Sequence, residues 1–127
     1  MTIRTIINNA ATILGMSDII RALKNGDNDE QLRANQNYNV LLGCFNLMIA
    51  QVAAAARIPL VEYVKSKTKL DDMPLSSQGL TYGLLAEYAF LNGMFNEARV
   101  WTVRFEQLLF QEITSGRKIT LPRGGRI

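Results

Sequence analysis

The stretch SQGLTYGLLAEYAFLNGMFNEARVWTVRFEQLL, residues 77 to 109, decides the fold of this chain. It holds two apolar helical patterns, from about Gln78 to Asn92 and from about Phe95 to Thr114. The dipeptide Asn92-Gly93 lies between them, and such dipeptides are typical of turns. The stretch therefore predicts a helical hairpin.

The first helix of this hairpin is apolar nearly all round, so we expect it to be buried between neighbours. Its large apolar residues are Leu80, Tyr82, Leu84, Leu85, Tyr88, Phe90 and Leu91. Gly83, Ala86 and Ala89 are small enough for close backbone approach. Glu87 is the exception, and a buried charge without a partner is costly. We expect it to pair with Arg99 or Arg104.

The second helix of the hairpin has two apolar faces. One face must pack on the core, and it carries Ala98, Trp101, Phe105, Leu108 and Leu109. Val100, Val103 and Phe110 lie on the opposite side. Because a contiguous exposed apolar patch indicates a partner, we predict that these three residues form a subunit interface.

Three further helices are predicted before the hairpin. The first runs from about Ile3 to Leu14, with Thr2 as its cap and Gly15 at its end. A short one covers Asp18 to Leu23. A long one runs from about Glu30 to Arg57, with Asp29 as its cap and Pro59 as its stop.

Two segments favour extended structure. Val61, Tyr63 and Val64 suit a short strand in the linker, and residues 118–121 alternate in a way that suits another. The predicted fold is therefore mostly α, a four-helix bundle of two helical hairpins with a short strand-like linker. We expect a helical domain over residues 1–116 and an extended basic C-terminal arm over 117–127.

Composition limits the chemistry that the chain can perform. The 127 residues are 48% hydrophobic, enough for one domain with a core. The single cysteine, Cys44, cannot form an internal disulfide and is expected to be a small buried hydrophobe. There is no histidine, which excludes Ser-His and Cys-His pairs and histidine metal sites. No glycine-rich phosphate loop is present. We predict a protein that is not an enzyme and uses no cofactor or metal.

The apolar segments do not predict membrane targeting. The opening MTIRTIINNAATIL alternates polar and apolar residues, so we expect no signal peptide. The segment Val40–Ala56 is near the lower length limit for a membrane span, but it includes Asn46 and Gln51. We expect a buried amphipathic helix there and no membrane contact.

The basic residues gather in two places, although the net charge is only +3. Lys65, Lys67 and Lys69 form one cluster, and the other consists of Arg117, Lys118, Arg123 and Arg126. Two interpretations stay open: a solvated linker and tail, or contact with an acidic partner or with nucleic acid phosphates.

Four segments together resemble one family. They are MTIRTIINNAATILGM, LLGCFNLMIAQVAAAARIPL, LTYGLLAEYAFLNGMFNEARVWTVRFEQLL and the basic tail RKITLPRGGRI. The chain resembles the head–tail connector (head-completion or adaptor) proteins of tailed bacteriophages and prophages. The resemblance implies a dodecameric ring docked below the portal at the capsid vertex, which extends the DNA channel and offers a platform for the tail.

Carried onto this chain, the resemblance implies roles for both basic clusters. The tail would be the arm that docks on the portal, through Arg117, Lys118, Ile119, Leu121, Arg123 and Arg126. Lys65, Lys67 and Lys69 would lie on a loop that faces either a partner or the channel. The expected partners are further copies of the chain, the portal protein, a tail or stopper protein, and DNA that passes without sequence specificity. The expected location is the virion neck, assembled in the host cytoplasm.

Two other functions are compatible with the residues. A small basic helical DNA-binding protein would carry several Arg, Lys, Asn or Gln side chains on one exposed helix face. The amides of Asn35, Gln36, Asn37 and Asn39 have few basic neighbours. A helical-hairpin protein-interaction module is the other alternative, although one hairpin cannot form a solenoid.

Overall fold

The described part of the chain is built from helices, and no strand forms within residues 1–120. The computed structural model describes the backbone of residues 1–120 and the side chains up to Thr114. The helices are α1 (Ile3–Leu14), α2 (Ser17–Lys24), α3 (Asp29–Arg33), α4 (Gln36–Ala56), α5 (Ser77–Leu91) and α6 (Phe95–Thr120). The predicted mostly α fold class is confirmed.

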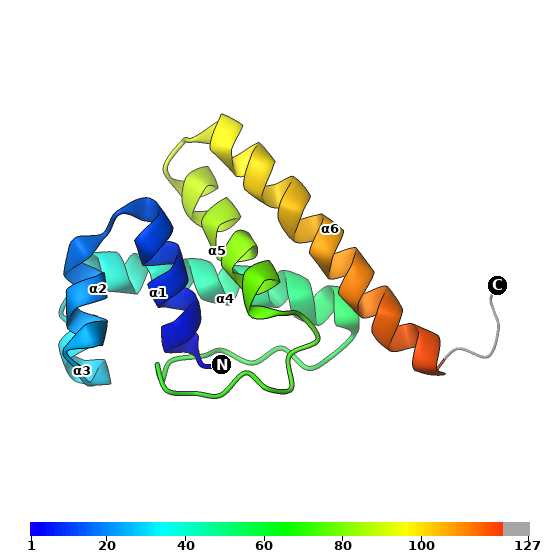
Figure 1. Cartoon of the computed structure of the whole chain (residues 1–127), viewed down its shortest axis with the longest axis horizontal. Helices are drawn as coiled ribbons and strands as arrows, with labels where there is room; N and C mark the ends of the chain where they lie inside the picture. The colour runs from blue at the N-terminus through cyan, green and yellow to red at the C-terminus, as the bar shows by residue number, and fades with distance from the viewer. Residues whose placement is uncertain (121–127) are drawn as a thin grey trace.

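Helix α5 is the centre of the packing, because it contacts α1, α4 and α6. Figure 1 shows α6 beside α5 along one edge of the molecule, with α4 passing across the α5–α6 hairpin and α1 near the base of α5. Phe45 and Met48 of α4, Leu84 of α5 and Phe105 of α6 are all buried. The predicted hairpin of residues 77 to 109 is therefore formed and packed.

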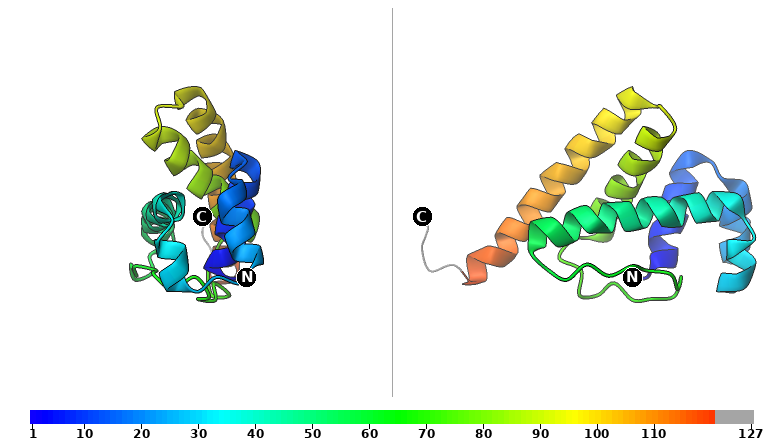
Figure 2. Two further views of the ribbon diagram at one scale, coloured as in Figure 1. Left: turned by 90° about the vertical axis from the view of Figure 1, so that its left-hand side faces the viewer. Right: turned by 180° about the vertical axis from the view of Figure 1, so that it is seen from behind.

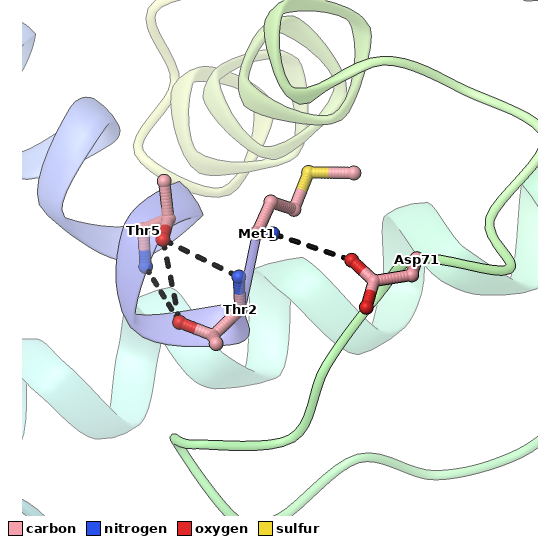
Figure 3. Close-up of polar contacts among 4 residues, drawn as sticks. All are labelled: Met1, Thr2, Thr5 and Asp71. Carbon is pink, nitrogen blue, oxygen red and sulfur yellow. Dashed lines mark hydrogen bonds and ion pairs between the residues drawn. The ribbon is translucent and has the colours of Figure 1, made fainter.

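Both predicted ends of α1 are confirmed. The Thr2 hydroxyl accepts a hydrogen bond from the backbone N–H of Thr5, and the Thr5 hydroxyl accepts one from that of Thr2 (Figure 3). Gly15 ends the helix with φ at 73°, a left-handed conformation that glycine adopts without strain. The amino group of Met1 lies 3.4 Å from Asp71 Oδ1 and ties the start of α1 to the linker (Figure 3).

The predicted long helix from Glu30 to Arg57 is wrong, because the chain breaks it at Ala34-Asn35 into α3 and α4. Asn35 is the reason: its side-chain oxygen accepts from the Tyr38 N–H at 3.1 Å and caps α4. The Asn35 amide also donates to Asp18 at 2.8 Å, which fixes the break against α2. A short polar side chain that bonds nearby backbone competes with helix continuation.

One cap prediction needs correction as well. Asn28, and not Asp29, caps α3, since the Asn28 oxygen accepts from the Gln31 N–H at 2.8 Å. The C-terminal end of this helix is close to the prediction, since α4 ends at Ala56 and Arg57 follows it at φ 57°.

The linker between α4 and α5 does not form the predicted strand at Val61, Tyr63 and Val64. A strand needs a neighbouring strand for its backbone hydrogen bonds, and the linker finds only an isolated bridge between Lys69 and Thr2. Side chains of the helices satisfy part of its backbone instead. Figure 2 shows this linker running along the side of α4 that lies away from the hairpin turn.

Helix α6 continues to Thr120, six residues past its predicted end at Thr114. The predicted strand over residues 118–121 is therefore wrong for residues 118–120. The first residue that cannot continue a helix is Pro122, so nothing before it forces an end. The predicted boundary between residues 116 and 117 falls within α6, and residues 121–127 of the predicted arm lie outside the described residues.

Candidate interaction surfaces

The outward face of α6 is an exposed apolar surface. Val100, Val103 and Phe110 are 49%, 48% and 73% exposed. On the opposite side of the helix Ala98 and Phe105 are buried, as predicted for the core face. The three residues are thus brought together on one open face, and their role as a subunit interface stays a prediction.

The turn of the α5–α6 hairpin carries a second apolar cluster, which the sequence did not predict. Phe90 and Leu91, expected to be buried, are 63% and 65% exposed, and Met94 and Phe95 are exposed with them. The rings of Phe90 and Phe95 meet edge to face with centroids 5.6 Å apart. The last turn of α5 projects beyond α1 and α4 (Figures 1 and 2), so no helix is left to cover it except α6. We call Phe90, Leu91, Met94 and Phe95 the hairpin tip.

A third apolar surface lies between α4 and the linker. Exposed Leu47, Leu60 and Val61 border a hollow of about 370 Å³, together with Gly43 and Ala50. The sequence could have indicated this surface only through the periodicity of α4, because Leu47 lies off the buried stripe of that helix. Leu60 and Val61 follow Pro59 in irregular chain, where periodicity gives no information.

The three linker lysines are brought to one exposed ridge. Lys65, Lys67 and Lys69 are exposed, while Ser66 and Leu70 between and beside them are buried. A tight turn holds the first of them, with the Thr68 N–H donating to the Lys65 carbonyl at 3.0 Å. The three lysines predicted to cluster are therefore exposed along one short linker segment, which we call the lysine ridge.

Side chains from two helices hold this ridge in place from one side. Arg4 of α1 donates from Nε to the Ser66 hydroxyl at 2.9 Å, and its guanidinium also donates to the Asp27 carbonyl. Asp29 Oδ1, at the start of α3, accepts from the Ser66 N–H at 3.0 Å. The hydrogen bonds from Ser66 hold the pKa of Asp29 below its ordinary value, although partial burial opposes this shift.

Asn46 of α4 makes the remaining clamp. Its side-chain oxygen accepts from the Tyr63 N–H at 2.7 Å, and its amide donates to the Tyr63 carbonyl at 2.8 Å. The Tyr63 ring then meets the Phe45 ring edge to face, with centroids 5.9 Å apart. One asparagine thus replaces the neighbouring strand that Tyr63 lacks.

The half-buried acid of α5, Glu87, has a different partner from the one predicted. The Gln51 amide of α4 donates to the Glu87 carboxylate, and no ion pair with Arg99 or Arg104 forms in the described structure. Arg104 lies instead over the rings of Trp101 and Tyr82, at 5.3 and 5.9 Å from their centroids. Burial raises the pKa of Glu87, and the hydrogen bond from Gln51 offsets part of that rise.

We expect Glu87→Gln to remove a pH dependence of stability. The folded protein holds the Glu87 proton more tightly than the unfolded chain does, so stability falls as pH rises from the ordinary carboxyl range through the raised pKa. The variant should therefore be more stable at pH 7, by less than about 1 kcal/mol because the group is only half-buried. Urea unfolding from pH 4 to 8 measures this, with exposed Glu30→Gln as the control. Lower stability of Glu87→Gln at pH 7 would contradict the assignment.

The described residues offer little reactive chemistry. Residues 1–114 contain no group of three His, Cys, Asp or Glu side chains placed to hold a metal. Cys44 is buried as predicted, and burial first, with Glu87 second, raises the pKa of its thiol to about 11. A hollow of about 1140 Å³ forms an open groove between residues 70–77 and the Glu112 region of α6.

The side chains of the predicted docking residues in the tail are not among those that the structure describes. Arg117, Lys118 and Ile119 belong to α6, but their side chains lie outside the described residues, as do Leu121, Arg123 and Arg126 altogether.

Helix α4 is long and apolar enough to cross a membrane by length and composition. It also supplies buried core residues such as Leu41, Phe45 and Val52, and core helices pass the same test.

Comparison with family models, with curated proteins and with solved structures finds no match to this chain. The surfaces themselves therefore have to carry the functional argument.

Proposed function

We propose that this chain is a structural head–tail connector (adaptor) subunit of a tailed phage or prophage. The observation that carries the proposal is the pair of separate apolar surfaces, one on α6 and the hairpin tip, the other around Leu47, Leu60 and Val61. A head-to-tail ring needs two different surfaces on each subunit, whereas a closed dimer needs only one. The segments that resemble connector proteins support the same conclusion.

In this proposal each surface has its own partner. Val100, Val103 and Phe110 lie at the interface between subunits of a dodecameric ring, and the basic tail with Arg117, Lys118 and Arg123 docks on the portal. The ridge of Lys65, Lys67 and Lys69 faces a tail or stopper protein or the phosphates of passing DNA. A cationic ridge attracts phosphates without reading bases.

The finer architecture and location belong to the same proposal. Helices α1, α4, α5 and α6 act as the four helices of a bundle, with α5 and α6 as one of its hairpins, and the basic docking arm begins within α6 at Arg117. The subunit has no catalytic role and no membrane contact, assembles in the host cytoplasm and resides in the virion neck.

Mixing the purified chain with the portal protein encoded by the same genome tests this function. We expect the purified chain to add a coaxial ring to the portal in electron micrographs, and native mass spectrometry to count its copies. Val103→Asp with Phe110→Asp should abolish the ring because it places charge in the interface, while exposed Glu30→Gln should leave it intact. Failure to bind the portal, combined with duplex binding that weakens steeply with salt, would favour the DNA-binding alternative instead.

A further inference from the structure

The outward face of α6 has the spacing of a coiled-coil seam. Asn96, Val100, Val103, Gln107 and Phe110 follow one another at steps of four, three, four and three residues, and all five are exposed. This heptad spacing keeps side chains along one stripe that faces a second helix. We propose that in the free protein α6 pairs through this stripe with α6 of a second copy, the two helices running antiparallel.

The charges beside the stripe are not paired with opposite charges within the described part of one chain, although Arg104 also lies over the rings of Trp101 and Tyr82. Glu97, Arg99, Arg104 and Glu106 flank it, and none has an opposite charge three or four residues away. Only such neighbours meet on a helix surface. Opposite charges recur instead seven residues apart, as Glu97 with Arg104 and Arg99 with Glu106, about 10 Å along the axis. None of the four forms an ion pair within the described residues.

A second copy in antiparallel orientation satisfies all four charges. When Val100 faces Val103 of the second copy, Glu97 lies beside Arg104 of that copy and Arg99 beside its Glu106. The twofold axis repeats each contact, so the pair contains four attractive contacts and no repulsive one. A parallel pair in the same heptads would instead place Arg99 beside Arg104 of the second copy, and two positive charges repel. The charge pattern therefore selects the antiparallel orientation.

The polar members of the stripe fit the same register. Asn96 falls opposite Gln107 of the second copy, so two amides that can both donate and accept hydrogen bonds meet on each side of the central valines. A polar pair within a seam is a known means of fixing register.

The ends of the paired helices account for the exposure of Phe110, which would be covered in the pair. In this register the helices overlap from Phe95 to Leu108, about 20 Å. Phe110 then lies just beyond the start of α6 of the second copy, next to the turn at Gly93 and the hairpin tip of that copy. Both surfaces are apolar and exposed in the single chain, and α6 lies at the edge of the molecule (Figure 1), where nothing blocks a second copy.

This inference does not rest on the connector function. A pair with twofold symmetry uses the same surface on both copies and closes on itself, so it describes the free subunit and not a polar ring. In a connector the pair would cover the α6 face until the portal offers a site for docking.

Two complementary charge reversals test the pairing by sedimentation of the full chain at low salt. Arg99→Glu alone brings two carboxylates together at each of its contacts, and Glu106→Arg alone brings two guanidinium groups together there. Each variant should therefore dimerise about tenfold more weakly than the parent protein. An equimolar mixture of the two can form a heterodimer, in which both contacts again join a carboxylate to a guanidinium, so the mixture should associate about as tightly as the parent protein.

The double variant Arg99→Glu with Glu106→Arg is a second rescue. It exchanges the two charges within one chain, so both contacts again join a carboxylate to a guanidinium. We expect this double variant to dimerise about as tightly as the parent protein. Arg21→Glu on α2 and Glu30→Arg on α3 make the same changes of charge away from α6 and should leave dimerisation unchanged.

Three results would overturn the pairing: a parent chain that stays monomeric at high concentration, single variants that dimerise like the parent, or a double variant that associates no better than either single one. All of these are measured without a portal. They are therefore distinct from a failure of the connector function, which the portal-binding experiment detects.

Discussion

Replacing Gly83 with leucine should lower the free energy of unfolding by about 3 kcal/mol or more. Gly83 lies where α5 crosses α4 and α6, and a Cβ atom there would come within 2.3 Å of Met48 Cγ and 2.7 Å of Phe105 Cδ1. Both neighbours are buried, so neither has free space to enter. A leucine would therefore force the helices apart. Urea unfolding followed by circular dichroism measures the loss, and the alanine variant should show an intermediate one.

Gly43→Ala is the matched control, with the opposite sign expected. Gly43 lies in the interior of α4, is exposed, and a Cβ atom there would meet nothing within 4 Å. Alanine should therefore stabilise the protein by up to about 1 kcal/mol through its higher helix propensity. Equal effects at the two glycines would show that the contact of α5 with α4 and α6 is not as tight as the structure has it.

The sequence predicts the helices well where a period and an end signal agree. Thr2 and Gly15 bound α1 as predicted, and the hairpin around Asn92-Gly93 is formed. The prediction fails where the decision depends on a contact distant in sequence. Several asparagines precede α4, and nothing local shows that Asn35 is the one that will cap the helix and bind Asp18.

The surfaces were predictable only where they repeat along a helix. Two faces of α6 were separable by periodicity, and Val100, Val103 and Phe110 are exposed as that pattern requires. The hairpin tip could not be predicted from the sequence, because α5 is apolar nearly all round and carries no period that distinguishes Phe90 from buried Leu84. How far α5 projects beyond its neighbours depends on the crossing with α4, which no local signal encodes. The partner of Glu87 was missed for the same reason.

Removing the side chain of Asn46 should release the linker and cost about 2–3 kcal/mol, because it leaves two backbone groups of Tyr63 without their hydrogen bonds in a half-buried site. The consequence for function is local. The lysine ridge depends on the linker staying against α4 and α1. In Asn46→Ala the linker backbone should therefore become flexible enough for trypsin to cleave after Lys65, Lys67 and Lys69. We expect limited proteolysis to cut there several times faster than in the parent protein, since cleavage follows the population of the opened segment.

Asn39→Ala provides the comparison within the same helix. Asn39 also donates a side-chain hydrogen bond to a backbone carbonyl, that of Arg33 at 2.8 Å, but it is exposed and lies near the start of α4, away from the linker contact. Its loss should lower stability slightly and leave the tryptic pattern of the linker unchanged. If both variants are cut at the same rate, global unfolding and not release of the linker governs cleavage, and the clamp by Asn46 does not hold the ridge. If only Asn46→Ala is cut faster, the Asn46 clamp helps to hold the lysine ridge in place, together with the contacts that Arg4 and Asp29 make with Ser66.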